Sequence, residues 1–101
     1  MKMLTAKNKK DLPKLYATDK TPLAEKIIIV KFFCPWSNWT WYVFEGQETE
    51  NGDYEFFGMV EGHEKELGYF TLGELESIRG PFGLKIERDR GFESVEYSKI
   101  S

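Results

Sequence analysis

The order of apolar and polar residues in the middle of the chain predicts two consecutive β-strands. Residues 26–33 are β-branched and apolar on both faces, which is typical of a strand in the interior of a sheet. Pro35 ends that strand because proline has no amide hydrogen to donate to a neighbouring strand. Residues 38–49 alternate, so that one face carries Trp39, Trp41 and Val43 and the other carries Thr40, Tyr42 and Phe44.

The dipeptide Asn51-Gly52 is the strongest hairpin signal in the sequence. Both residues tolerate the positive φ that a type I′ turn requires. A third strand over about residues 54–62 is then expected to run back along the second. Counted outward from the turn, the register pairs Phe44 with Met59, Val43 with Val60 and Gly46 with Phe57, and a bulge near Gly46 would shift it.

Residues 71–79 carry the signals of a short helix. Thr71 and Glu74 have the spacing of a capping box, in which each side chain accepts a hydrogen bond from an otherwise unpaired amide. The residues expected along its buried stripe are Leu72, Leu75 and Ile78. Its carboxyl end is marked by Arg79, by Gly80 as a left-handed cap and by Pro81, which cannot continue a helix.

The remaining segments complete an α+β pattern. Thr5 is a suitable N-cap for a first helix that ends at Leu12, before Pro13. Residues 84–88 alternate as a half-exposed strand does, and residues 92–97 are extended. The predicted order is α-β-β-β-α-β, with an antiparallel sheet of about four strands and two short helices in a single domain over residues 1–101.

Composition changes this picture in one respect, which is the content of aromatic residues. Three Trp, five Tyr and eight Phe make up 16% of the chain, and large rings are an efficient way to fill the core of a small domain. The net charge of −3 lacks the basic excess that is typical of nucleic-acid binders. Positive charge is concentrated in N-terminal lysines, and the middle of the chain is acidic.

The sequence predicts a cytoplasmic protein with no membrane partner. Its N-terminus lacks the apolar core of a signal peptide, and Ile27–Val30, the longest apolar run, is far too short to span a bilayer. Cys34 is the only cysteine, so an internal disulfide cannot form.

Two motifs suggest a redox-active thiol and a metal site, but the sequence around each does not fit that function. Cys34-Pro35-Trp36-Ser37 looks like the Cys-Pro-x-Ser motif of monothiol glutaredoxins, which needs a following helix to activate the thiol, whereas a strand is predicted there. Glu61, His63, Glu64 and Glu66 lack the ligand spacing of a metal site. We therefore expect no catalytic residues, no metal and no cofactor.

A binding surface is the alternative to catalysis, and its candidate residues are Trp36, Trp39, Trp41, Tyr42, Tyr69, Arg79, Arg88 and Asp89. The aromatic residues could line a groove for a sugar, a base or a peptide, or they could be covered by helices. The arginines could present guanidinium groups to a phosphate or carboxylate, or they could form structural ion pairs with neighbouring acidic residues.

Several longer strings resemble one known family. They are Ser37-Asn38-Trp39-Thr40-Trp41-Tyr42, Glu66-Leu67-Gly68-Tyr69-Phe70, Arg79-Gly80-Pro81, Gly83-Leu84 and Ile86-Glu87-Arg88-Asp89. The chain resembles, over about residues 4–92, a bacterial family of short single-domain proteins known only as a domain of unknown function. Members are often encoded on plasmids, conjugative elements and phages, so the resemblance implies a mobile-element setting and supplies no catalytic residues. Cys34 stands where the family would have Thr or Asp.

These observations leave three functional hypotheses. The first is a non-enzymatic accessory protein that binds another protein through an aromatic, acidic surface, with inhibition of a host defence system as one form. The second is a nucleic-acid accessory protein, with N-terminal lysines on phosphates and aromatic rings stacked on bases. The third is a small enzyme of unknown reaction that combines Glu87, Arg88 and Asp89 with Tyr69.

Overall fold

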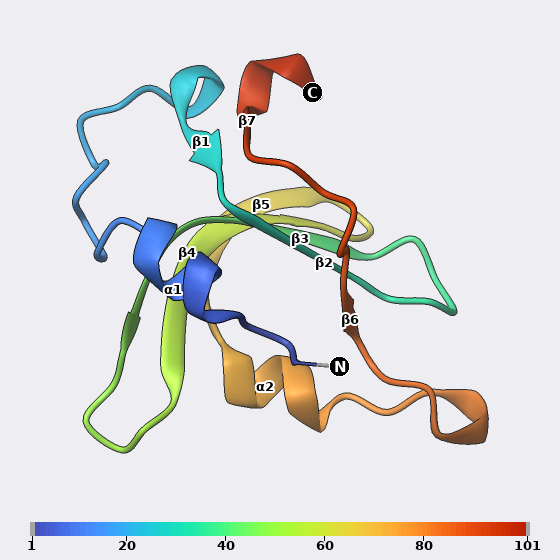
Figure 1. The fold of residues 1–101 in the computed structure, drawn as a ribbon. Helices are drawn as coiled ribbons and strands as arrows, with labels where there is room; N and C mark the ends of the chain where they lie inside the picture. Colours follow the sequence, from blue (N-terminus) through green and yellow to red (C-terminus); the bar gives the residue numbers. More distant parts are fainter. Residues whose placement is uncertain (1, 101) are drawn as a thin grey trace.

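The computed structural model describes residues 2–100 and is built around one five-stranded antiparallel sheet (Figure 1). The strand order is β5-β4-β3-β2-β6. The strands are β2 (Val30–Phe33), β3 (Thr40–Glu48), β4 (Tyr54–Glu61), β5 (Lys65–Thr71) and β6 (Glu87–Arg88). A separate two-stranded ribbon pairs β1 (Ile27–Ile28) with β7 (Val95–Glu96).

Helical segments are short and connect or flank the sheet. The α-helices are α1 (Ala6–Asp11) and α2 (Leu72–Ser77), and the 3₁₀ turns are η1 (Leu23–Glu25), η2 (Pro81–Gly83) and η3 (Tyr97–Lys99). At the start of α1, Thr5 and Asn8 form a reciprocal capping box. The α+β class with two short helices and an antiparallel sheet is confirmed.

The predicted element order was incomplete because it lacked β5. Residues 65–71 pair with β4 over seven positions without irregularity. Two charged residues and Gly68 interrupt the apolar pattern there, so periodicity alone did not indicate a strand. The segment 26–33 is also divided at Ile29. Before this residue β1 pairs with β7 in the separate ribbon, and after it β2 belongs to the main sheet.

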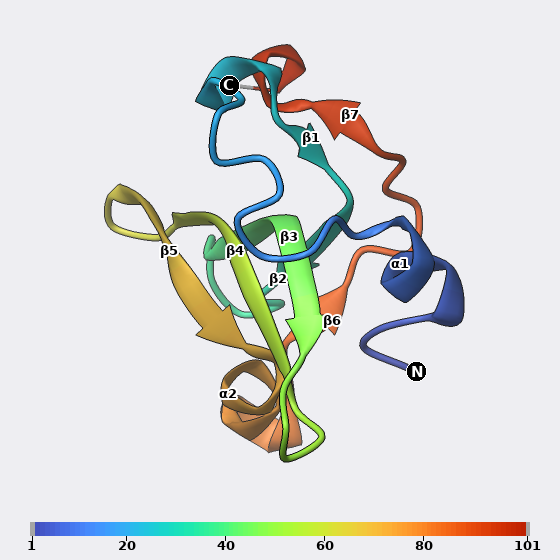
Figure 2. The same cartoon turned by 90° about the vertical axis from the view of Figure 1, so that its left-hand side faces the viewer.

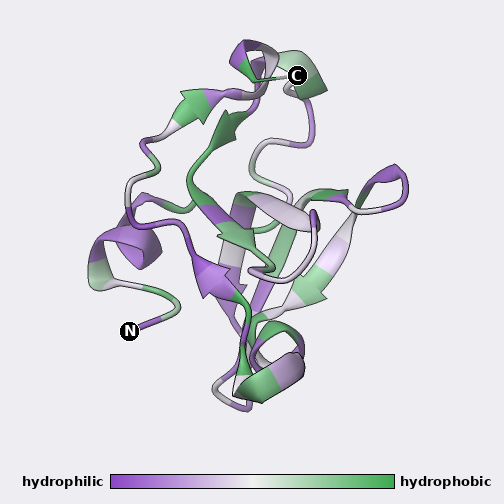
Figure 3. Cartoon of the chain, turned by 90° about the vertical axis from the view of Figure 1, so that its right-hand side faces the viewer, coloured by the Kyte–Doolittle hydropathy of each residue, from purple (hydrophilic) through white to green (hydrophobic). Residues whose placement is uncertain are grey.

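Each face of the sheet is covered by a separate apolar cluster. The first face, which carries Trp41, Val43 and Phe56, packs against Leu12 at the end of α1 and Leu75 of α2. The second face carries Tyr42, Phe44, Phe57 and Met59, and is covered by Ile28, Val95 and Tyr97 of the ribbon segment. Figure 3 shows the apolar residues of β1 and β7 at the top of the molecule and the strongly polar β6 below them. The predicted division of β3 between two faces is therefore confirmed.

The predicted register of the β3–β4 hairpin was wrong in two ways. The loop has three residues, with a hydrogen bond from the Gly52 amide to the Thr49 carbonyl, and positive φ occurs at Gly52 but not at Asn51. This geometry is a type I turn followed by a left-handed glycine, not a type I′ turn. A bulge between Val43 and Glu45 then shifts the pairing again, so that Val43 faces Gly58.

The end of α2 also differs from the prediction. The helix stops at Ser77, and Gly80 has a φ of −111° and so is not a left-handed cap. Of the predicted stripe, Leu75 is buried, whereas Ile78 is 36% exposed. The early stop leaves Ile78 on the surface, where it borders the site described below.

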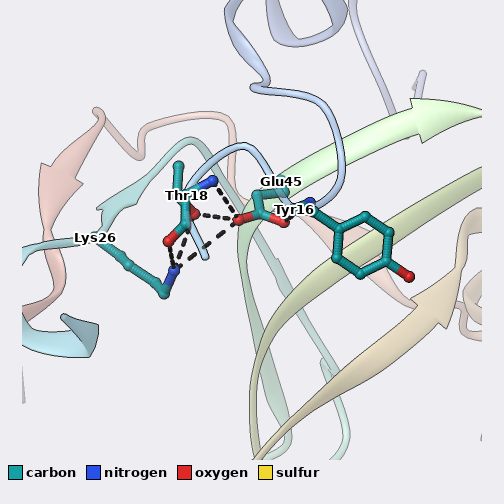
Figure 4. A network of polar contacts seen from close by, with 4 residues as sticks. All are labelled: Tyr16, Thr18, Lys26 and Glu45. Carbon is teal, nitrogen blue, oxygen red and sulfur yellow. Dashed lines mark hydrogen bonds and ion pairs between the residues drawn. The ribbon is translucent and has the colours of Figure 1, made fainter. Parts of the chain in front are cut away.

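Glu45 anchors the long loop between α1 and η1 from inside the protein (Figure 4). Its carboxylate accepts hydrogen bonds from the Tyr16 amide at 2.7 Å, the Thr18 amide at 3.0 Å and the Thr18 hydroxyl. The Lys26 ammonium lies 3.9 Å from the carboxylate and donates to the Thr18 carbonyl and hydroxyl. Glu45 and Lys26 are both buried, so this network is shielded from water.

Candidate functional site

The connection between β2 and β3 places two tryptophans at one end of the first face. The Cys34 amide donates to the Trp39 carbonyl at 3.0 Å, and the Ser37 amide donates to the Cys34 carbonyl at 3.3 Å. These bonds close residues 34–39 into a compact loop, seen at the right of Figure 1. Trp36 and Trp39 are half-buried, and Trp41 is buried at 7% exposure.

Each half-buried tryptophan packs one side of its ring against a glycine. A Cβ atom added at Gly62 would lie 2.4 Å from the Trp39 ring, and one at Gly80 would lie 2.5 Å from the Trp36 ring. Both distances are too short for any residue with a side chain. The glycines therefore allow the rings to lie flat against the backbone, and this contact fixes their positions.

The three tryptophans meet at one apolar hollow of about 390 Å³. Its lining residues are Cys34, Trp36, Ser37, Trp39, Trp41, Ile78 and Ile86. A second hollow on the other side of Trp39 is lined by Val60, His63, Glu64 and Glu66. The Trp39 ring stands 5.7 Å from the His63 ring, edge to face. Trp39 thus lines both the apolar hollow and a second hollow that carries the carboxylates of Glu64 and Glu66.

A strained loop lies directly beside Trp36. Phe82 is fully exposed and has a φ of +56°, a conformation that costs a non-glycine residue about 1–2 kcal/mol. Hydrogen bonds from Gly80 to Leu84 (2.8 Å) and from Leu84 to Pro81 (3.1 Å) close the loop. Figure 1 shows η2, which contains Phe82, projecting from the body of the protein at the lower right. We call Trp36, Trp39, Ile78, Phe82 and Leu84 the aromatic surface.

The sequence of residues 3–99 matches the family described as "Protein of unknown function (DUF2958)". The chain belongs to this family. The family assignment agrees with the resemblance seen in the sequence, and it covers nearly the whole fold described above. No curated protein and no solved structure shows a significant match to the chain.

Two of the predicted aromatic site residues lie away from the aromatic surface of this DUF2958 protein. Tyr42 is on the second face, where its ring is 6.3 Å from that of Tyr97 and the Lys31 ammonium lies 5.9 Å away. Burial, followed by the charges of Glu61 and Asp89, raises the pKa of the Tyr42 hydroxyl. Tyr69 is on the edge strand β5, and its ring is 5.0 Å from that of Phe57.

The charged candidates make contacts within the protein. The Arg79 guanidinium donates to the carbonyls of Glu76 and Ile78 at the end of α2, as suits its position there. Arg88 donates to the Lys2 carbonyl at 3.2 Å. Asp89 lies 3.5 Å from the Lys31 ammonium, so among the described residues its ion pair is with a lysine and not with Arg88.

The fold does not bring together the residues of the enzyme, thiol and metal hypotheses. Tyr69 lies on β5 and the segment Glu87–Asp89 begins on β6, at opposite edges of the sheet. Cys34 is buried and is followed by a loop and β3 in place of an activating helix. Within residues 2–100, no group of three or more His, Cys, Asp or Glu side chains could hold a metal ion. The helices in this range are all too short or too polar to cross a membrane.

Phe82, the most exposed large residue of the aromatic surface, was not among the residues predicted for the site. A signal for it was present, because Phe82 stands between Gly80-Pro81 and Gly83. Glycine and proline on both sides favour a turn, which places a large apolar residue between them outside helices and strands. Its proximity to Trp36, however, depends on the packing of Gly80 against the ring.

Proposed function

We propose that this DUF2958 protein is a non-enzymatic module that binds another protein through the aromatic surface. Phe82 carries the proposal. It is fully exposed and contributes no packing to the fold, yet it occupies a strained conformation in a loop closed by backbone hydrogen bonds. Backbone strain of this kind clusters at functional sites, and aromatic residues, Phe among them, are enriched at the centre of protein interfaces.

The neighbouring residues favour a protein surface as the ligand. Trp36 and Ile78 line the apolar hollow, and the loop that begins at Gly80, against the Trp36 ring, carries the exposed Phe82 and Leu84. Glu64 and Glu66 lie on the far side of Trp39. A partner with an apolar pocket for Phe82 and a basic side chain opposite these carboxylates would be complementary.

The setting that we propose is a plasmid, conjugative element or phage, with the protein acting inside the cytoplasm. One form of this role is inhibition of a host defence nuclease, because acidic side chains can occupy a channel built for phosphates. The carboxylates in the hollow beside Trp39 support inhibition of a nuclease. Because the net charge is only −3, these carboxylates could match the charge of a nuclease channel only locally. Binding that weakens steeply with salt is expected for it.

Photocrosslinking at Phe82 tests the proposal directly. The chain carrying p-benzoylphenylalanine in place of Phe82 is irradiated in host cells, and Tyr16, which is 64% exposed and distant on the second face, receives the same label as a matched control. We expect a discrete adduct with the first label that is absent with the second. The purified partner should then bind the parent chain at least tenfold more tightly than Phe82→Ser. Identical adducts from both labels, or equal affinities, would refute the proposal.

A nucleic-acid partner is the alternative, and at the aromatic surface it requires the N-terminal lysines to lie beside the tryptophans. The lysines of α1 lie on the left in Figure 1, whereas the loop with Trp36 and Trp39 lies on the right. This separation is why we rank the alternative second. A low-salt gel-shift assay with single- and double-stranded DNA and RNA distinguishes the two. If the parent chain retards a nucleic acid and Trp39→Ala abolishes the retarded band, the nucleic-acid function would replace the protein-binding function that we propose.

A further inference from the structure

The free edge of β5 is a second exposed surface, separate from the aromatic surface. Strand β5 is the outermost strand of the sheet and pairs with β4 on one side only. Figure 2 shows it at the left-hand edge, with no other part of the described chain beyond it. An edge strand presents unpaired amides and carbonyls, which makes it a template for pairing with another strand.

Apart from Lys65 and Glu66 at its start, this edge lacks the features that usually prevent pairing. Its register with β4 is regular throughout, so no bulge twists it away. Residues 67–71 contain no charge and no proline. Leu67 is 45% exposed and Tyr69 is 49% exposed, and both point to the second face of the sheet. An apolar pair of this kind on an open strand is a typical association site.

We propose that β5 pairs antiparallel with β5 of a second copy of this chain, about a two-fold axis at Gly68. In this register Leu67 of each copy lies opposite Tyr69 of the other, so the two exposed apolar side chains cover each other. The rows of side chains across the sheet continue through the interface, because Tyr69 already packs against Phe57 with ring centres 5.0 Å apart. Cross-strand pairs of an aromatic and an aliphatic residue stabilise sheets.

Charge and space on the strand favour the same register. Lys65 of the second copy lies opposite Thr71, which is paired with Glu55 on β4. Its ammonium lies 3.9 Å from Glu61 within its own copy, and in this register it can also reach the Glu55 carboxylate, which has no ion pair among the described residues. Glu66 lies opposite Phe70 of the second copy and not opposite another carboxylate. At Gly68 nothing lies within 4 Å of the position of a Cβ, so two glycines meet at the axis without obstruction.

A disulfide-trapping experiment tests both the partner and the register. Directly opposite residues in an antiparallel pair have Cα atoms about 4.5–5.5 Å apart, which suits a disulfide. In a Cys34→Ala background, Gly68→Cys is therefore expected to form a covalent dimer under mild oxidation. Glu66→Cys is the matched control, because its symmetry mate lies four residues further along the paired strand. Trapping of the control in preference to Gly68→Cys would overturn the register.

Charge variants test whether association depends on this edge. Sedimentation velocity of the parent chain should show a monomer at low micromolar concentration and a dimer near millimolar concentration, because a single-strand interface is small. The double variants L67K/Y69K and L67E/Y69E should each remain monomeric, and their mixture should form a heterodimer. A parent chain that is monomeric at every concentration overturns the proposal. So does a lysine variant that dimerises, or a mixture that does not associate.

Discussion

Replacing Glu45 with alanine should destabilise the fold more than any single surface change. The carboxylate is 2% exposed and accepts three hydrogen bonds from Tyr16 and Thr18. Without it, two backbone amides lose their acceptor, at about 1–3 kcal/mol for each buried group. The Lys26 ammonium also loses its counter-charge, and breaking a buried ion pair costs about 3–5 kcal/mol. Because these terms overlap, we expect a total loss of about 3–5 kcal/mol.

Urea unfolding followed by tryptophan fluorescence measures this loss. A domain of this size has about 5–15 kcal/mol of stability, so Glu45→Ala should still fold, with Tm lowered by roughly 15–30 °C. Lys26→Met breaks the same ion pair but should cost about 3 kcal/mol, the lower end of the range for a broken buried pair, because Glu45 keeps its hydrogen bonds to Tyr16 and Thr18. Hydrogen exchange should localise the change, with the amides of Tyr16 and Thr18 exchanging faster.

A double-mutant cycle separates the ion pair from the hydrogen bonds. Glu45→Gln and Lys26→Met each leave one buried charge unpaired, whereas the double variant leaves neither. The effects should therefore be non-additive by about 1–3 kcal/mol. Additive effects would mean that the two charges, 3.9 Å apart, do not stabilise each other. A loss below about 1 kcal/mol for Glu45→Ala would refute the claim that this carboxylate holds the loop.

Three further changes test other parts of the structure. Phe82→Asn should raise the free energy of unfolding by about 0.5–1 kcal/mol in thermal melts, because asparagine tolerates positive φ better and the ring packs on nothing; a loss of stability would contradict the strain argument. Gly62→Ala should displace the Trp39 ring, lower stability by about 1–3 kcal/mol and increase acrylamide quenching, whereas Gly68→Ala, with open space at its Cβ, should do neither. Burial and a hydrogen bond to the Glu61 carboxylate raise the pKa of Tyr97 above its usual value of 10.0. The protonated hydroxyl therefore contributes fully to folding stability below about pH 10, and this contribution is lost as the pH rises through the pKa of the folded state. Tyr97→Phe should flatten the alkaline end of the stability–pH curve, and an unchanged slope would count against this assignment.

Local signals in the sequence were sufficient wherever neighbouring residues decide the conformation. The N-caps at Thr5 and Thr71 are observed, because a capping side chain accepts a hydrogen bond from an amide only three residues away. The strand over residues 40–48 and the division of its side chains between two faces followed from alternation alone. The resemblance to a family of unknown function was also visible, and the family match over residues 3–99 confirms the family.

Contacts between distant segments decided what the sequence could not. The hairpin register depended on a bulge between Val43 and Glu45, and no local pattern indicates which residue is left unpaired.

The sequence by itself thus determined the fold class, the family and the aromatic content. Tertiary structure alone decided the site: the Trp36 ring lies on Gly80, more than forty residues later in the chain, and Gly80 begins the loop that carries Phe82. It also decided that Tyr69 and Asp89 belong to opposite edges of the sheet, because strand order is set by pairing across the whole domain.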